Sequence, residues 1–366
     1  GCEFDGPEDL FDWVRSRGGL VDQRLFVHEG AAGRGVFARE AIGSGETIVS
    51  VPFELMILER DHPCDTVRVL SEELRKGRCS TYWPYLRFVK DIDVDIPDAW
   101  SLEELALLDG LPPGVWRSHT TRLTDQCGEL GLSDAFVARA VALHVSRSGP
   151  HGMQPVFDAF NHGFNSTSHD LRFRDVRRTA DNAHMFVTRR DIAAGEEIFN
   201  TFRPGAGLGR ALVHRMVGHG FYVDGAPEFF RDYGFIEKPP VLWWFNTSML
   251  AEASSGRPPA GKQLRWVIED DAGSVYWPDA HSMDWGEFVM EAQRVLRALD
   301  DRSRAYGDAG VRCASYIHGA QPVGVAPRCG TGSPSDRRVL LALLYRAAFE
   351  SAVRAALAAA EVAAAG

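Results

Sequence analysis

Paired cysteines, a surplus of basic charge and long apolar runs are all missing from this sequence. Its six cysteines are scattered along 366 residues and form no Cys-x-x-Cys pair, so a cysteine zinc site has no local support. Low cysteine density and the lack of a secretory hydrophobic segment favour a reducing intracellular compartment, cytoplasmic or nuclear. A plastid location stays open, because a transit segment ahead of Gly1 would direct the chain there.

Acidic residues outnumber basic ones, with 50 Asp and Glu against 40 Lys and Arg and a formal net charge of −10. This balance argues against a nucleic-acid surface, which needs a concentrated basic face, and suits a partner that carries basic residues. No apolar run reaches the ~20 residues of a membrane span, so we expect no membrane partner. The length and the 45% hydrophobic content fit a globular protein of two or three lobes, expected to be monomeric.

The order of predicted elements lacks the βαβ alternation of a doubly wound nucleotide-binding fold. Short apolar runs cut by glycine predict small antiparallel strands over 25–52, and a second strand-rich region covers 170–202. Helices are predicted over 8–18, 65–78, 101–109, 133–148, 284–301 and 336–362. We expect Ser335 to cap the last helix and 305–334 to form a long loop. Because the doubly wound nucleotide-binding fold is not predicted, any cofactor must be bound by a different kind of site.

Two glycine-containing stretches are candidates for contact with a ligand. Glycines in Gly33-Arg34-Gly35 let the backbone approach a ligand closely, although a plain turn between two strands explains them as well. Tyr233 precedes Gly234 and either presents its hydroxyl at a site or packs as a core aromatic at the end of a strand. Each stretch alone is a weak signal.

A polar cluster ends a short apolar segment. Asp158, Asn161 and His162 together supply a carboxylate, an amide and an imidazole, a mixture that suits an amino-acid-like or nucleoside ligand. The alternative is a buried cluster whose members satisfy one another. A metal-dependent hydrolase that uses His162, His169 and Asp170 is a further alternative, but that spacing matches no common chelate.

Taken together and in this order, the stretches resemble the SET-domain protein methyltransferases. The resemblance is carried by GRGVFA at 33–38, DAFNH at 158–162, a Gly-Glu strand at 194–198 and DYGF at 232–235. The split-SET subgroup, which includes the Rubisco large-subunit lysine methyltransferase and the actin-histidine methyltransferase, has an inserted helical segment that residues 74–86 resemble. The likeness covers roughly residues 20–238.

The resemblance implies an α+β fold of small antiparallel sheets, of the β-clip type, split by a helical insertion. The implied parts are 1–64 and 146–238 for the two halves of the SET domain, 65–145 for the insertion, and 239–366 for a mainly helical lobe that binds substrate. The implied activity is transfer of a methyl group from S-adenosylmethionine to a protein lysine, with histidine as the second choice. The cofactor-binding residues implied by motif position are Gly33, Arg34, Gly35, Ser146, Arg147, Asp158, Asn161, His162 and Tyr233, and no metal is implied.

The chain departs from the family pattern at the position of the catalytic tyrosine after the Gly-Glu strand, where it has Phe202. A missing hydroxyl there costs on the order of 10²-fold in rate. The interval from Phe202 to Tyr233, the implied active-site tyrosine, is also long, so 219–221 is an alternative match to the Tyr-Gly-Phe motif and Tyr222 a candidate replacement hydroxyl. A catalytically degenerate SET module that binds a protein is therefore the alternative function.

Overall fold

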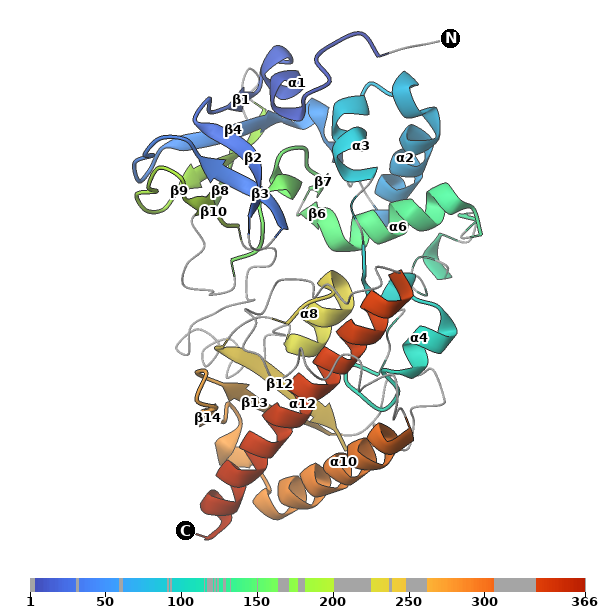
Figure 1. Cartoon of the computed structure of the whole chain (residues 1–366), viewed down its shortest axis with the longest axis vertical. Helices are drawn as coiled ribbons and strands as arrows, with labels where there is room; N and C mark the ends of the chain where they lie inside the picture. The colour runs from blue at the N-terminus through green and yellow to red at the C-terminus, as the bar shows by residue number, and fades with distance from the viewer. Residues whose placement is uncertain are drawn as a thin grey trace. The chain divides into compact units, whose positions relative to one another are not determined.

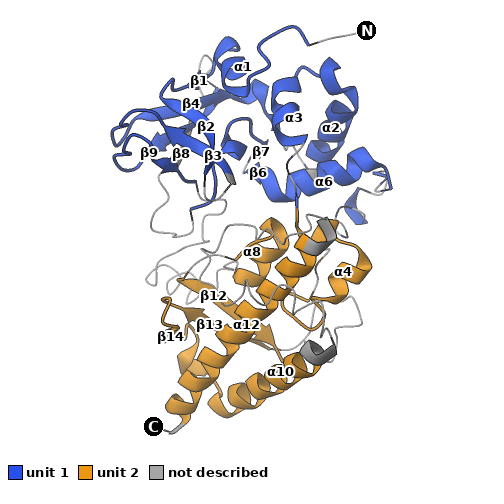
Figure 2. Cartoon of the chain, viewed as in Figure 1, with its two compact units in different colours: residues 1–94, 117–163, 168–202 blue, residues 95–116, 164–167, 203–366 orange. Residues whose placement is uncertain are grey.

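The computed structural model of the chain contains two compact units (Figure 1, Figure 2). The first comprises residues 1–94, 117–163 and 168–202, and the second comprises 95–116, 164–167 and 203–366. The structure describes residues 4–30, 33–58, 62–90, 92, 94–114, 116, 121, 123, 125–127, 130–131, 133–149, 151–163, 171–176, 182–200, 225–236, 239–247, 262–305 and 334–365.

A four-stranded antiparallel sheet of order β1-β4-β9-β8 forms part of the first unit. Its strands are β1 (Leu20–Val21), β4 (Thr47–Pro52), β8 (Leu171–Val176) and β9 (Ala183–Thr188). β4 and β9 pair from Thr47 opposite Val187 to Pro52 opposite Ala183, so strands far apart in the sequence are neighbours in space. Both strand-rich regions predicted from the sequence therefore contribute to one sheet.

A second sheet, of order β10-β3-β2, carries the predicted glycine-rich strand. Its strands are β2 (Leu25–Gly30), β3 (Gly33–Ala38) and β10 (Glu197–Ile198). β2 and β3 form a hairpin in which Gly30 lies opposite Gly33, while β10 pairs with β3 only at Val36 and Phe37. A third small sheet joins β5 (Ile57–Leu58), β7 (Gly152–Met153) and β6 (Ser148–Gly149).

The helices of the first unit are α1 (Leu10–Ser16), α2 (Pro63–Lys76), α3 (Trp83–Lys90) and α6 (Ala135–Arg147), with short 3₁₀ turns η1 (Phe53–Leu55), η2 (Gly77–Cys79) and η4 (Phe157–Ala159). α1, α2 and α6 begin after a side chain that accepts from free N–H groups of the first turn. Asp9 caps α1 and Asp134 caps α6, and α2 packs against α6. The predicted helices over 8–18, 65–78 and 133–148 are therefore present.

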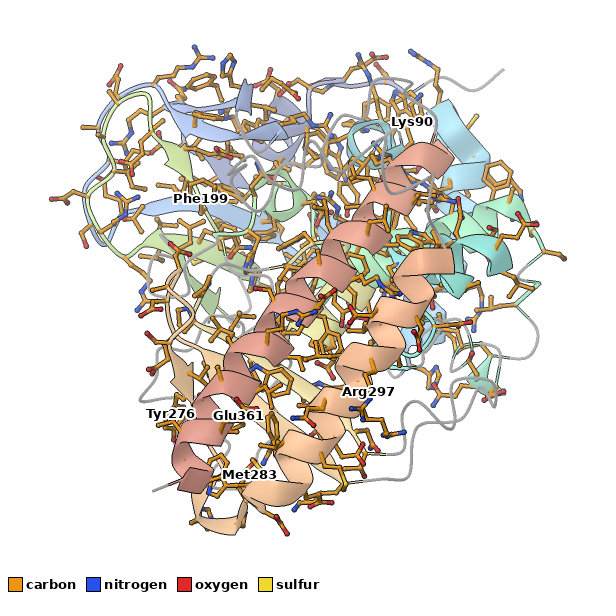
Figure 3. The ribbon with its side chains drawn as sticks, turned by 60° about the horizontal axis from the view of Figure 1, so that its bottom comes forward. Lys90, Phe199, Tyr276, Met283, Arg297 and Glu361 are labelled. Carbon is orange, nitrogen blue, oxygen red and sulfur yellow. A yellow bond between two sulfur atoms is a disulfide. The ribbon has the colours of Figure 1, made fainter. Side chains whose placement is uncertain are left out.

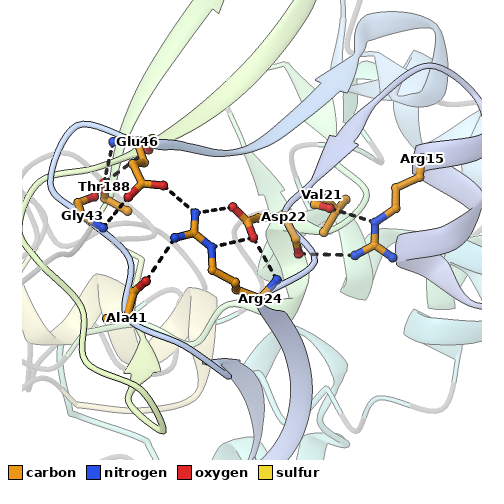
Figure 4. A network of polar contacts seen from close by, with 8 residues as sticks. All are labelled: Arg15, Val21, Asp22, Arg24, Ala41, Gly43, Glu46 and Thr188. Carbon is orange, nitrogen blue, oxygen red and sulfur yellow. Dashed lines mark hydrogen bonds and ion pairs between the residues drawn. The ribbon is translucent and has the colours of Figure 1, made fainter.

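A polar network fixes the start of β2 to β4 and β9 (Figure 4). Arg24 binds Asp22 through Nε at 2.9 Å and also binds Glu46, whose other carboxylate oxygen accepts from the Gly43 N–H at 2.6 Å. The Thr188 hydroxyl donates to the Gly43 carbonyl at 2.7 Å. The hydrogen bond from Arg24 lowers the pKa of Asp22, so this carboxylate stays ionised at neutral pH.

A disulfide joins Cys64, at the start of α2, to Cys127, with the two Cα atoms 5.9 Å apart. It closes a loop across a sequence separation of 63 residues and links the start of α2 to Cys127. The scattered cysteines gave no sign of this link, because their spacing in the sequence says nothing of distance in the fold.

The second unit combines helices with a three-stranded sheet, β12-β13-β14. Its elements are η3 (Pro97–Ala99), α4 (Leu102–Ala106), α8 (Ala226–Tyr233), β12 (Val241–Asn246), β13 (Gln263–Ile268), β14 (Val275–Tyr276), η5 (Ala280–Ser282), α10 (Trp285–Ala305) and α12 (Pro334–Ala365). α10 and α12 pack against each other; Figure 3 labels Arg297 on α10 and Glu361 on α12. α12 begins at Pro334, so the prediction of Ser335 as its cap is wrong, because Ser335 already lies in the first turn.

Aromatic side chains form much of the core of the second unit. The ring of Tyr345 on α12 stacks on Phe230 of α8 at 4.4 Å between centroids, and Trp243 of β12 lies 5.9 Å from Tyr345. All six residues of β12 are buried, so the strand lacks the alternation that marks a half-exposed strand in a sequence. The sequence therefore predicts the helices of this unit but not its sheet. Among the described residues, no helix has both the length and the apolarity needed to cross a membrane.

Candidate functional site

Three segments that the sequence analysis singled out meet in the first unit. The Asn161 carbonyl accepts from the Asn200 N–H at 2.9 Å, and the Gly163 N–H donates to the Asn200 carbonyl at 2.8 Å. This parallel bridge ties the Asp158–His162 stretch to the chain that leaves β10, while β10 itself pairs with the glycine-rich strand β3. Figure 3 labels Phe199 in this connection. Backbone hydrogen bonds thus bring together residues from three separate parts of the sequence.

The polar stretch follows a strained residue. Val156, just ahead of η4, has φ +74° and is fully buried. A β-branched residue at positive φ is an outlier that the surrounding packing must hold in place. Strain of this kind concentrates at functional sites, which supports a functional role for the residues that follow Val156.

Asn161 is held by a residue that the sequence analysis did not select. Its Nδ2 donates to Oε1 of Glu197 on β10 at 2.7 Å. A Cβ atom at Gly35 would lie 2.2 Å from the same Oε1 and 2.8 Å from Asn161 Nδ2, so the space beside Gly35 is filled by this pair. Burial raises the pKa of Glu197, and the hydrogen bond from Asn161 opposes the rise. Glu197 was visible in the sequence only as part of the Gly-Glu strand.

Asp158 has a partner in the helical insertion. Its carboxylate accepts a hydrogen bond from the hydroxyl of Tyr85 on α3, and both residues are buried. Burial raises the pKa of Asp158 to about 7, against the opposing effects of the Arg147 charge and the Tyr85 hydrogen bond. Arg147 donates through Nη1 to the Asp158 carbonyl at 3.1 Å. Asp158 and Arg147 therefore adjoin each other in the first unit.

Other predicted cofactor residues have side chains engaged within the protein. The Ser146 hydroxyl donates to the Ala142 carbonyl of its own helix at 2.8 Å. The Arg34 guanidinium lies over the ring of Phe88 on α3, 4.0 Å from the centroid, and donates to the Phe88 carbonyl at 3.0 Å. His162 is buried, with 3% exposure. That Arg34 and Ser146 contact a cofactor stays a prediction. Because both side chains are engaged within the protein, we expect such contacts to come from their backbone groups.

Tyr233 belongs to the second unit and is the last residue of α8. It is half-buried, with its ring 4.7 Å from that of Phe229. Gly234 ends the helix at φ +77°, and a Cβ there would meet the Asp95 carbonyl oxygen at 2.6 Å, so both conformation and space require glycine. The expectation that a purely structural Tyr233 would end a strand is wrong; it ends a helix.

Several predicted residues lie outside the described part of the chain: Phe202, His169, Asp170, the alternative motif at 219–221 and Tyr222. In the described residues, the one group of three side chains positioned to bind a metal is His62, Cys64 and Cys127, none of which belongs to the proposed hydrolase set. His62 Nδ1 accepts from the Cys64 N–H at 3.2 Å and the two cysteines are disulfide-bonded, so these ligand atoms are already engaged.

Comparison with known proteins agrees with the fold. Residues 33–203 match the family model of the SET domain. Among solved structures, Rubisco LSMT bound to AdoMet is similar, with 14% identity over 98% of this chain and 92% of that chain and a TM-score of 0.59. The SET domain of LSMT bound to lysine and AdoHcy is also similar, with 14% identity over 96% and 90% of the two chains and a TM-score of 0.59. No curated protein sequence matches the chain. The predicted α+β fold of small antiparallel sheets with a helical C-terminal region is confirmed.

Proposed function

We propose that this chain, which carries a SET domain over residues 33–203, is an S-adenosylmethionine-dependent protein-lysine methyltransferase. The observation that carries the proposal is the meeting of β3, the Asp158–His162 stretch and the end of β10 in one unit. None of these segments is near the others in the sequence. β3 and the Asp158–His162 stretch match cofactor-binding motifs, and β10 matches the Gly-Glu strand of the family pattern. The solved structures of Rubisco LSMT with AdoMet, with lysine and with methyllysine support both the cofactor and the substrate class.

The polar groups of the site fit S-adenosylmethionine. This cofactor offers an ammonium and an adenine amine as donors and a carboxylate as acceptor. In the described part of the chain, the side-chain oxygen Oδ1 of the half-buried Asn161 accepts no hydrogen bond, whereas the side-chain nitrogen Nδ2 donates to Glu197. Arg147 is half-buried and uses Nη1 on the Asp158 carbonyl, which leaves further N–H groups of its guanidinium for a carboxylate.

When bound, S-adenosylmethionine supplies an activated methyl group on a sulfonium. The protein must then orient a neutral amine along the S–CH₃ bond and exclude water, which is mainly a positioning task. The lysine side chain has an ordinary pKa of ~10.4 and is mostly charged at neutral pH, so the amine must lose its proton before it can accept the methyl group. An apolar environment around the amine would favour its neutral form, and histidine is the second choice of substrate residue.

Calorimetry with S-adenosylmethionine, followed by transfer of labelled methyl groups to proteins in a lysate, tests the proposal. We expect binding and labelling by the wild type and loss of both in Asn161→Ala. Asn182→Ala is the matched control, because the Asn182 side chain is exposed. Its backbone carbonyl accepts from the Phe53 N–H at 3.0 Å, and the substitution leaves that hydrogen bond in place. Binding of the cofactor without labelling of any protein would contradict the transferase assignment.

A degenerate SET module that binds a protein is the second candidate, supported by Phe202 at the usual tyrosine position. Phe202→Tyr separates the two functions. A gain in transfer of roughly 10²-fold would mean that the natural chain is degenerate, whereas no gain or a loss would mean that another group replaces the hydroxyl.

A further inference from the structure

The carboxylate of Glu197 is enclosed on more than one side. Its Oε1 accepts from Asn161 Nδ2 at 2.7 Å, and the space beside Gly35 that a Cβ would fill is taken by the same oxygen. Its Oε2 lies 3.2 Å from the position of a Cβ at Gly30, on the other strand of the β2–β3 hairpin. Gly35 therefore makes room for this carboxylate, while a Cβ at Gly30 would meet the Phe37 ring at 2.7 Å as well as the carboxylate. The carboxylate contacts one candidate ligand-binding side chain, that of Asn161.

The chemistry of this contact fixes which end of the Asn161 amide faces the site. An ionised carboxylate can only accept hydrogen bonds, so it binds the NH₂ end of the amide and never the carbonyl end. The two ends of an amide have nearly the same shape, and without such a partner a flip costs little. Because Glu197 occupies the NH₂ end, the carbonyl oxygen is the end left for a ligand.

We propose that Glu197 is a positioning residue that orients the Asn161 amide so that its carbonyl oxygen accepts from the ammonium of the cofactor's amino-acid part. The inference rests on the proposed function and names a determinant of its binding site. A nearby negative charge favours a cationic donor over the neutral adenine amine and disfavours the ligand's carboxylate. The pair thus selects the ammonium by charge as well as by hydrogen-bond direction.

Glu197→Gln tests the proposal, because glutamine keeps the shape but removes the charge and presents both a donor and an acceptor. Affinities are measured by calorimetry for two ligands: S-adenosylhomocysteine, which carries the amino-acid part, and 5′-methylthioadenosine, which lacks it. We expect the variant to bind S-adenosylhomocysteine about tenfold more weakly, a difference of ~1.4 kcal/mol, and to bind methylthioadenosine as the wild type does.

Glu196→Gln is the matched control. Glu196 is the neighbouring carboxylate, but it binds Arg190 at 2.5 Å and the Ala193 N–H at 2.8 Å, away from Asn161. We expect unchanged affinity for both ligands, since no ligand-facing group depends on it.

A paired substitution provides a second test that does not depend on Glu197→Gln alone. Asn161→Asp places two carboxylates face to face and should weaken S-adenosylhomocysteine binding by more than tenfold. Adding Glu197→Gln restores a hydrogen bond in the reverse direction, because the new glutamine amide at position 197 donates to the new carboxylate at position 161. The other oxygen of that carboxylate then faces the ligand and can accept from it. We expect the double variant to recover most of the lost affinity.

The outcomes are distinct. Equal weakening for both ligands, no weakening for either, or no rescue in the double variant would overturn the role of Glu197 while leaving the proposed function intact. A wild-type protein that binds neither ligand nor S-adenosylmethionine would overturn the proposed function, and the inference with it.

Discussion

The buried pair of Asp158 and Tyr85 predicts how stability depends on pH. Burial raises the pKa of Asp158 from 3.8 to about 7 in the folded protein, while the unfolded chain keeps the ordinary value. Between these two values the folded state binds more protons than the unfolded state. The free energy of unfolding therefore falls as the pH rises from about 4 to about 7, and this effect is complete above the folded pKa.

The size of the effect follows from the two pKa values. A difference of 7 − 3.8, or about 3 units, corresponds to about 4 kcal/mol at ~1.4 kcal/mol per unit. Asp158 is buried, with 8% exposure, so solvent screening reduces this figure little. It is a large share of the ~5–15 kcal/mol that stabilises a typical domain.

Urea unfolding of the cofactor-free protein from pH 4 to pH 8, compared with Asp158→Asn, measures the effect. The variant is neutral throughout and can still accept from Tyr85, so the wild type should lose about 4 kcal/mol relative to it across this range. In Tyr85→Phe, loss of the hydrogen bond that lowers the Asp158 pKa should extend the decline to higher pH. Parallel pH profiles for the wild type and Asp158→Asn would refute the reasoning.

Two further predictions concern the site and the insertion. Gly35→Ala should displace the Glu197–Asn161 pair, at a cost of about 1–3 kcal/mol in stability and with weaker cofactor binding, because its Cβ would lie 2.2 Å from Glu197 Oε1. Gly131→Ala, where no atom lies within 4 Å of the new Cβ, is the control, and equal thermal shifts and affinities for the two variants would contradict the packing argument. Reduction of the Cys64–Cys127 disulfide should lower the free energy of unfolding by about 4 kcal/mol, as expected for a loop of this length. Because Cys79 is also disulfide-bonded, a Cys64→Ala/Cys127→Ala double variant should respond to dithiothreitol less than the wild type does, and an equal response would exclude the Cys64–Cys127 disulfide as the cause.

Local patterns in the sequence predicted helices and strands better than they predicted contacts between residues that are distant in the sequence. The helix expected over 133–148 forms as α6, which begins after the capping residue Asp134, and the short strands follow their glycine punctuation. β12 was missed because all six of its side chains are buried and no alternation marks it. The contact of Tyr85 with Asp158 joins residues 73 positions apart, and no spacing rule reports such a pair.

The site contains two buried or half-buried carboxylates that differ in what they contact. Asp158 faces a tyrosine of the helical insertion and has a pKa near 7, so its charge at neutral pH depends on small changes around it. Glu197 faces Asn161, and burial and the hydrogen bond act in opposite directions on its pKa. Asp158 therefore links the site to α3, and Glu197 fixes which end of the Asn161 side-chain amide faces a ligand. Both roles require residues from distant segments to meet, which explains why the motif Asp158–His162 is informative only together with β3 and β10.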